Sequence, residues 1–238
     1  MPIRIILTQL LCIAGNLERA GKILRQITSL DSGREHVQLI TITDALIQGE
    51  ERRRAVWREG VLPGFLEEPG EREKQAAWSA TCLANGNFTA LDKSIEKLET
   101  LVAKTPVTIK DEKHEWMFDL SELSPFFFEA ISPSGEYYWI PFDQVRRVEV
   151  TTPVRHIDRV WCPVDVQLTS DQSLKLFFCN LYPATCDMAG ENDALLTGKE
   201  THWTEIDGGR RILVGRKVYL LPNESEISTY DFNPLEIG

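Results

Sequence analysis

The residue types best suited to catalysis gather between positions 137 and 163, where the chain reads YYWIPFDQVRRVEVTTPVRHIDRVWCP. Cys162, His156 and Asp158 could supply a thiol nucleophile, its general base and an orienting carboxylate. Six residues of strand or loop do not by themselves bring these three groups together. The chain also has no Gly-x-Ser-x-Gly elbow to present a serine nucleophile. We therefore predict no catalytic residue.

Motifs for metals and nucleotides do not appear either. The candidate metal ligands are Cys162, Cys179, Cys186, His156 and His202. No two of them stand at the close C-x2-C or H-x3-H spacing that helps to assemble a zinc site. In residues 190–199 (GENDALLTGK), seven residues separate the glycines where a phosphate loop has four, and Glu200 replaces the Ser or Thr that holds magnesium. We predict neither a metal nor a cofactor.

The distribution of charge indicates a boundary near Pro106. Residues 1–105 contain 14 Lys/Arg and 14 Asp/Glu, whereas residues 106–238 contain 12 and 22, so the second part carries the whole net charge of −10. An acidic surface repels phosphate backbones, which argues against nucleic acid and anionic membranes as partners. We predict a helical domain over 1–105 and a β-rich domain over 106–238.

The remaining composition is typical of a cytoplasmic protein. The apolar runs are too short to span a bilayer, and the N-terminus shows no charged region, apolar region and cleavage site of a signal peptide. Five scattered cysteines, an odd number, do not resemble a disulfide framework. We expect reduced thiols and a cytoplasmic location.

Residues 1–105 show a repeated helix-turn-helix pattern. Three segments, LLCIAGNLERAGKIL, ALIQGEERRRAVW and CLANGNFTALDKSI, place Gly15, Gly49 and Gly86 between apolar helical runs, 34 and 37 residues apart. Glycine can end a helix in the left-handed conformation, and Asn or Glu can begin the next. The period resembles that of tetratricopeptide (TPR) repeats. Such a layer either binds peptides and proteins or is purely structural.

From Trp116 onward, short segments typical of antiparallel strands replace the helical period. They are residues 118–120, 126–131, 137–140, 146–150, 164–168, 174–178, 211–214 and 217–221. Pro141 cannot donate a hydrogen bond to a sheet, so we expect it at a strand end or at a sheet edge. The sequence as a whole predicts an α+β fold, with an N-terminal TPR-like helical layer and a C-terminal antiparallel β-rich domain.

The order and spacing of several motifs resemble the ImpE family, also called TagJ or SciE, which are accessory proteins of bacterial type VI secretion systems. These motifs are YYWIPF at 137–142, VEV at 148–150, D-x-x-W-x-P at 158–163 and YP at 182–183. Residues 7–20 (LTQLLCIAGNLERA) are similar to the helical part of the same family. The resemblance implies a non-enzymatic adaptor that binds the N-terminal helix of the small contractile-sheath subunit, in a helix-in-groove mode, and is linked to the ATPase that recycles the sheath.

The family motif also suggests partner-binding positions. They are Trp139, Pro141, Phe142, Arg146, Arg147, Trp161 and Pro163. For the two tryptophans the sequence favours a position in the hydrophobic core over one at an interface, and for the two arginines it favours solvated surface over a contact with a partner.

Two departures from the family pattern stand out. Family members carry a further helix or helix pair before the QLLC segment, whereas here Met1 lies eight residues before Gln9. Either the start of the sequence is shortened, or this variant lacks the helices that cap the helical layer. We expect Ile3, Ile6 and Leu10 to be less covered as a result. The change of Trp-x-Pro-Ala to WCPV at 161–164 is conservative.

Two other hypotheses stay open. The first is an enzyme or small-ligand-binding protein with a site around Trp139, His156, Trp161 and Cys162, which a packed aromatic core would count against. The second is a TPR-like scaffold with an unrelated protein partner.

Overall fold

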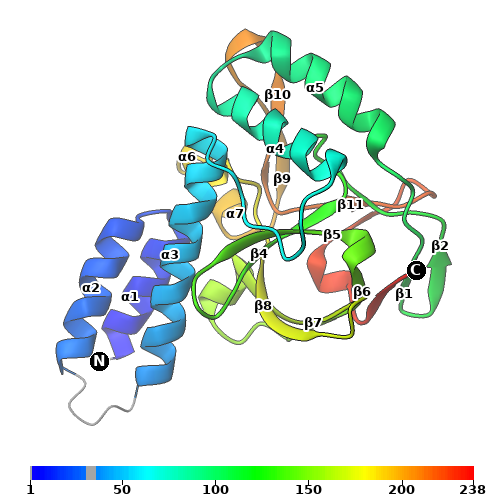
Figure 1. Cartoon of the computed structure of the whole chain (residues 1–238). Coiled ribbons are helices and arrows are strands. Elements are labelled where there is room, and N and C mark those ends of the chain that lie inside the picture. The colour runs from blue at the N-terminus through cyan, green and yellow to red at the C-terminus, as the bar shows by residue number, and fades with distance from the viewer. Residues whose placement is uncertain (1, 31–35) are drawn as a thin grey trace.

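The computed structural model describes residues 2–30 and 36–238 and places its first three helices and its next two in separate groups beside a central sheet (Figure 1). The helices are α1 (Pro2–Ile13), α2 (Leu17–Leu30), α3 (Val37–Glu59), α4 (Glu71–Ala84), α5 (Phe88–Leu101), α6 (Thr185–Met188) and α7 (Asp193–Leu196). The strands are β1 (Val107–Ile109), β2 (Glu112–His114), β3 (Phe118–Asp119), β4 (Phe127–Ile131), β5 (Tyr137–Pro141), β6 (Val145–Val150), β7 (Trp161–Leu168), β8 (Ser173–Cys179), β9 (Thr201–Glu205), β10 (Arg211–Gly215), β11 (Tyr219–Leu220), β12 (Glu226–Ile227) and β13 (Leu235–Ile237). The short 3-10 helices are η1 (Phe142–Gln144), η2 (His156–Arg159), η3 (Asp207–Gly209) and η4 (Thr229–Asp231). The predicted α+β fold is confirmed.

Two of the three predicted turns between helices are confirmed. Gly15 and Gly86 have left-handed backbones, with φ of +74° and +65°, between α1 and α2 and between α4 and α5. The side chain of Asn87 then accepts a hydrogen bond from the backbone N–H of Ala90 and caps the start of α5. The repeated Gly-Asn pair therefore builds two helical hairpins.

The turn predicted at Gly49 is wrong, because α3 continues through this position and ends at Gly60, whose φ is +72°. Gly49 instead lets the helix approach the sheet: a Cβ atom there would lie 2.3 Å from Cγ2 of Ile131 on β4. The three glycines are periodically spaced in the sequence, but Gly49, the middle one, is required for close packing of α3 on the sheet and not for a turn.

The large sheet has eight strands in the order β2-β1-β13-β6-β7-β8-β4-β5, all antiparallel. All eight predicted strand segments overlap strands of the structure. Pro141 is the last residue of the edge strand β5, as predicted. Two smaller sheets, β10-β9 and β12-β11-β3, pack beside the large one.

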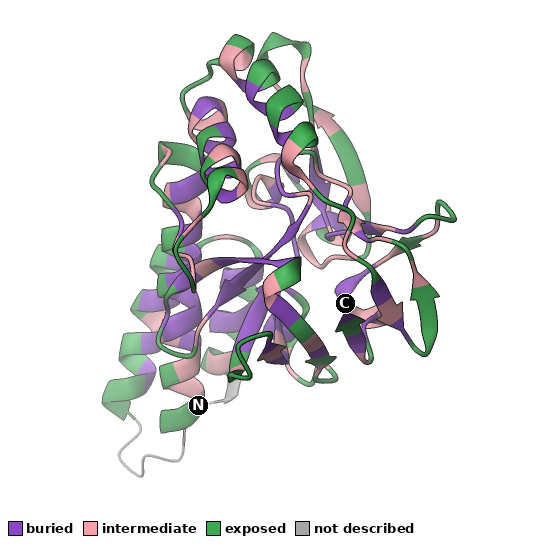
Figure 2. Cartoon of the chain, turned by 45° about the vertical axis from the view of Figure 1, so that its right-hand side comes forward, coloured by how far each residue is buried: buried purple, intermediate pink, exposed green. Residues whose placement is uncertain are grey.

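The large sheet buries apolar side chains on both faces (Figure 2). On β7, Trp161 belongs to the cluster that contains the helices, whereas its neighbour Cys162 belongs to a second cluster on the other face. This is the alternation expected of a strand covered on both sides. The first cluster joins side chains of the helical and β-rich parts, and the division into domains at 1–105 and 106–238 stays a prediction.

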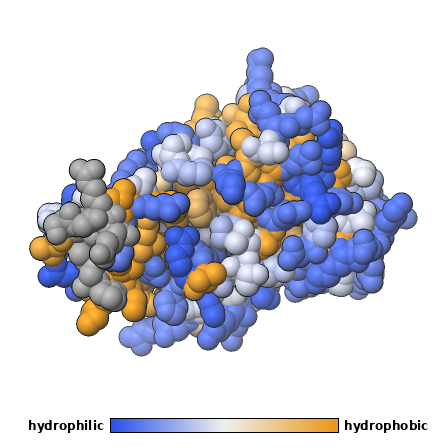
Figure 3. Space-filling model, turned by 90° about the horizontal axis from the view of Figure 1, so that it is seen from below, coloured by the Kyte–Doolittle hydropathy of each residue, from blue (hydrophilic) through white to orange (hydrophobic). Residues whose placement is uncertain are grey.

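The N-terminal helix leaves apolar side chains in contact with solvent. Ile3, Ile6 and Leu10 are 81%, 46% and 49% exposed, as expected from the sequence. Figure 3 shows apolar surface next to the grey residues on the side of α1–α3. None of the described helices is both long enough and apolar enough to cross a membrane.

Candidate functional site

The family-motif residues lie at two different depths. Trp139, Phe142 and Trp161 are each 1% exposed and belong to the aromatic core. Pro141 is buried and Pro163 is half-buried. The core position expected for the two tryptophans is therefore confirmed.

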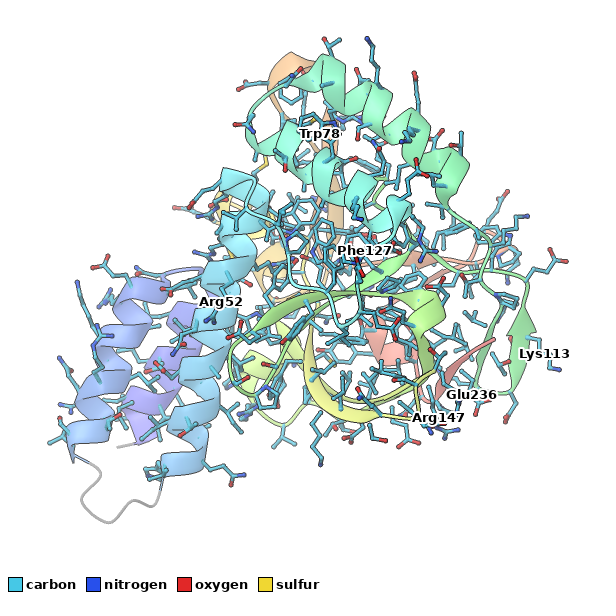
Figure 4. All side chains as sticks on the ribbon, viewed as in Figure 1. Arg52, Trp78, Lys113, Phe127, Arg147 and Glu236 are labelled. Carbon is cyan, nitrogen blue, oxygen red and sulfur yellow. The ribbon has the colours of Figure 1, made fainter. Side chains whose placement is uncertain are left out.

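The two arginines of the motif lie at the surface of β6. Arg146 forms an ion pair with Asp171, and Arg147 pairs with Glu236 at 2.5 Å (Figure 4). A partner-binding role for the motif residues stays a prediction. Arg146 is exposed and Arg147 and Pro163 are half-buried, so these are the members that could contact a partner directly.

Both buried tryptophans aim their indole N–H groups at polar partners beside α3. Trp139 Nε1 donates to the hydroxyl of Tyr137 at 2.6 Å, and Trp161 Nε1 donates to Oε2 of Glu50 at 3.3 Å. A buried indole nitrogen needs such an acceptor. The motif therefore connects the sheet to a polar network at the junction with the helices.

The centre of this network is a buried salt bridge between α3 and β4. Arg53 donates from Nε to Oε1 of Glu129 at 2.8 Å and from Nη2 to Oε2 at 3.0 Å, and Nη2 also reaches the carbonyl oxygen of Leu181 at 2.6 Å. Lys217 Nζ lies 3.2 Å from Glu129 Oε2 and 2.7 Å from Asp119 Oδ2. Two cations thus face two carboxylates inside the protein.

The charges of this network hold its carboxylate ionised. Burial alone would raise the pKa of Glu129, but Arg53 and Lys217 outweigh burial and lower that pKa to about 2. Trp57 Nε1 adds a hydrogen bond to Glu129 Oε1 at 2.8 Å, and the hydroxyl of Tyr137 donates to the same oxygen. The network is a neutralised structural junction and leaves no free base for catalysis at Glu129.

The sequence analysis did not predict this network. The signal was present: Glu50, Arg53 and Trp57 stand at helical spacing i, i+3 and i+7, so they share one face of α3. Glu129 is a single charge inside the apolar run FFFEAI. A buried charge requires a buried partner, and the helix face offers one.

An apolar cleft of about 250 Å³ opens beside the network, where α3, α4, α6, β10 and the β3–β4 loop meet. Its apolar lining includes Trp57, Leu83, Leu123, Met188, Ile206, Ile212 and Leu213. Arg58 and Asp187 also line the cleft and form an ion pair of 2.5 Å between α3 and α6. The almost fully buried Glu50 and Arg53 line it too, already engaged with each other.

The cleft suits apolar side chains better than a reactive substrate. Met188 and Ile212 are half-buried, so a ligand in the cleft could cover them further. Methionine adapts its shape to different partners, which is common at protein-binding surfaces. Hydrophobic burial would supply the binding free energy, and the flanking ion pair would fix orientation.

The four groups of the alternative β-domain site do not come together. Cys162 lies on the face of the sheet opposite Trp161, and burial raises the pKa of its thiol to about 12. His156 is exposed, and Trp139 is packed against Phe127 with ring centroids 4.2 Å apart. The packed aromatic core counts against this site. Within residues 2–30 and 36–238, no three His, Cys, Asp or Glu side chains are grouped to hold a metal.

Comparison with known proteins agrees with the motifs. The family model described as "ImpE protein" matches residues 111–236. The type VI secretion system accessory component TagJ of Pseudomonas aeruginosa is 24% identical over 235 residues, which cover 98% of this chain and 80% of that protein. A crystal structure of a Vibrio parahaemolyticus protein superimposes with a TM-score of 0.89 at 20% identity, covering 100% of this chain and 87% of the other, and shows a shared fold.

Proposed function

The chain belongs to the ImpE protein family, and on that premise we propose that it is a non-enzymatic adaptor of a bacterial type VI secretion system. The similarity to TagJ, an accessory component of such a system, supports this role over nearly the whole chain. A cytoplasmic location, where a contractile sheath would assemble, belongs to the same proposal.

The observation that carries the binding part of the proposal is the apolar cleft between α3, α4 and β10. A helix can insert apolar side chains from one face into such a hollow, with charged residues meeting its own charges at the rim. Arg58 and Asp187 lie half exposed at 42% and 48% and could exchange their mutual ion pair for a partner's charges. We take the N-terminal helix of the small sheath subunit as the occupant, and the sheath-recycling ATPase as an indirect partner.

Two features speak against the enzymatic alternative. Glu129, the deepest carboxylate beside the cleft, is neutralised by Arg53 and Lys217. Burial raises the pKa of the Cys12 and Cys162 thiols to about 12, so little thiolate is available near neutral pH. A scaffold with an unrelated partner differs from our proposal only in the bound protein, and a pulldown from cell lysate followed by mass spectrometry identifies that protein.

The cleft is tested with a fluorescently labelled peptide of the sheath subunit's N-terminal helix. We expect Met188→Glu and Ile212→Glu each to weaken binding by tenfold or more, because a carboxylate would be buried among apolar groups at a cost of about 2 kcal/mol. Val154→Glu is the matched control, since Val154 is 89% exposed and lies outside the cleft. Equal affinity in all three variants and the wild type would exclude the cleft.

The exposed motif arginines provide the competing surface in the same assay. If Arg146→Ala and Arg147→Ala weaken the peptide while the cleft variants do not, the partner binds on β6 instead. If the wild-type chain neither binds the peptide nor co-purifies with the sheath subunit, the adaptor proposal is lost.

A further inference from the structure

A second hollow, of about 620 Å³, lies away from the cleft and shares no lining residue with it. It forms where residues 150–153, Arg159, residues 197–199, Arg216 and residues 230–233 converge. These residues lie at or near the ends of β6, η2, α7, β10 and η4, so the hollow collects segments that are distant in sequence.

Three cations line this hollow without an ionic partner. Among the described residues, nine arginines form ion pairs with carboxylates and six form none. Two of these six, Arg159 and Arg216, lie together in this hollow with Lys199, which also forms no ion pair. The nearby carboxylates are engaged elsewhere: Glu200 faces His202 at 3.3 Å, and Asp158 is held by Arg155 at 2.6 Å. In a protein with a net charge of −10, a local group of unpaired cations marks an unusual positive site.

The backbone fixes the two arginines next to each other. Gly198 has a φ of +66°, and a Cβ atom there would lie 3.8 Å from both the carbonyl oxygen of Arg159 and Cβ of Arg216. The backbone N–H of Arg216 donates to the carbonyl of Glu200 at 2.9 Å, and Asn180 Nδ2 donates to the carbonyl of Arg159 at 3.1 Å. The backbones of both arginines are therefore anchored close to the same glycine.

One donor of this group lacks an acceptor. Arg216 Nε is buried and makes no hydrogen bond. A buried donor without an acceptor costs free energy, and an anion that reached this nitrogen through a change of the Arg216 rotamer would remove that cost. Arg210 Nε also lacks an acceptor, but Arg210 pairs with two carboxylates, whereas Arg216 combines the orphan nitrogen with an unpaired charge.

The surrounding groups indicate which anion would fit. Arginine binds phosphoryl oxygens through its planar fork, and lysine adds a point charge. The hydroxyl of Thr152 can donate as well, whereas that of Thr197 already donates to the carbonyl oxygen of Asp193 at 2.6 Å. Pro153 and the ring of Tyr230 offer apolar surface beside them. Three cations exceed what a single carboxylate needs, but they match a phosphoryl group of about −1.5 to −2. We propose that this hollow binds a phosphate-bearing small molecule.

The proposal is tested by titrating the full chain with inorganic pyrophosphate at low salt, using isothermal calorimetry. We expect saturable binding that weakens about tenfold in Arg159→Gln and in Arg216→Gln, because each loses a charge-assisted hydrogen-bond donor. Arg19→Gln is the matched control: it removes the same charge from an exposed position on α2, outside the hollow, and should leave binding unchanged. Lys199→Gln, at an exposed position, should weaken binding even if Arg216→Gln unfolds.

Several results would overturn the proposal. Absence of saturable binding does so directly. Equal weakening by Arg19→Gln and Arg159→Gln would show only diffuse attraction to positive charge. A peptide rich in Asp and Glu that displaces pyrophosphate at lower concentration would assign the hollow to an acidic protein segment. None of these outcomes depends on the sheath peptide, so this site and the adaptor role can fail separately.

Discussion

Replacing Arg53 by methionine should destabilise the protein strongly, because it breaks the buried junction between α3 and the sheet. The side chain would lose its two-point contact with Glu129 and its hydrogen bond to the carbonyl oxygen of Leu181. Glu129 would keep Lys217 at 3.2 Å and the indole N–H of Trp57 at 2.8 Å, so its charge would be only partly compensated.

The expected loss follows from these contacts. Breaking a buried ion pair by removing one partner costs about 3 to 5 kcal/mol, and the remaining Lys217 places this case near the lower limit. The carbonyl of Leu181 loses its charged donor, which adds about 1 kcal/mol. We expect a loss of about 4 kcal/mol in the free energy of unfolding, or a decrease in Tm of roughly 8 to 16 °C for a chain of this size.

Chemical denaturation followed by circular dichroism, together with calorimetric Tm, measures this loss. Arg146→Met is the matched control, because Arg146 is an exposed arginine paired with Asp171 and should contribute at most about 1 kcal/mol. A loss in Arg53→Met no larger than that of the control would refute the reasoning that the buried network holds the two parts together.

Three further predictions address acid stability, packing and thiol chemistry. The pKa of Glu129 is lowered from 4.5 to about 2. Ionised Glu129 therefore stabilises the fold fully above pH 4.5, and this contribution disappears as the pH falls toward 2. The difference in unfolding free energy between the wild type and Glu129→Gln should shrink over that range. Gly49→Ala should destabilise the protein by about 1 to 3 kcal/mol, since the added Cβ would lie 2.3 Å from Ile131. In Gly21→Ala the added Cβ has its nearest neighbour at 3.5 Å, so this variant should stabilise α2 by up to about 1 kcal/mol. Urea titrations measure both changes. Cys162, with a pKa raised to about 12, should resist alkylation by iodoacetamide at pH 8 until the protein unfolds. Peptide mass spectrometry measures this labelling, and fast labelling of the native state would contradict the burial of Cys162.

Much of the architecture could be predicted from local patterns. Short apolar segments located eight of the described strands but not β1, β2, β9, β12 or β13, and Gly-Asn pairs located two of the helical hairpins. Strand β13 was missed because it has only three residues, and its place between β1 and β6 depends on a contact between distant parts of the chain. Gly49 misled the prediction because its role, an approach to Ile131, is also a long-range contact.

The candidate site was less accessible to sequence reasoning than the fold. The family motif pointed to the correct region, but Trp139 and Trp161 proved to be parts of the core that adjoins the buried network. The apolar cleft combines residues from α3 to β10, and no single stretch contains enough of them to reveal it. The cations of the second hollow, such as Arg159 and Arg216, are likewise 57 positions apart and are joined only by the fold.

The adaptor role in its proposed form is tested most directly by hydrogen exchange of the full chain, measured with and without the N-terminal helix of the sheath subunit as a peptide. Our account predicts slower exchange in the segments around the cleft, at the end of α3, in α6 and in β10. It also predicts no change in β6, the strand of the two surface arginines Arg146 and Arg147. Unchanged exchange around the cleft at saturating peptide, or protection confined to β6, would contradict it.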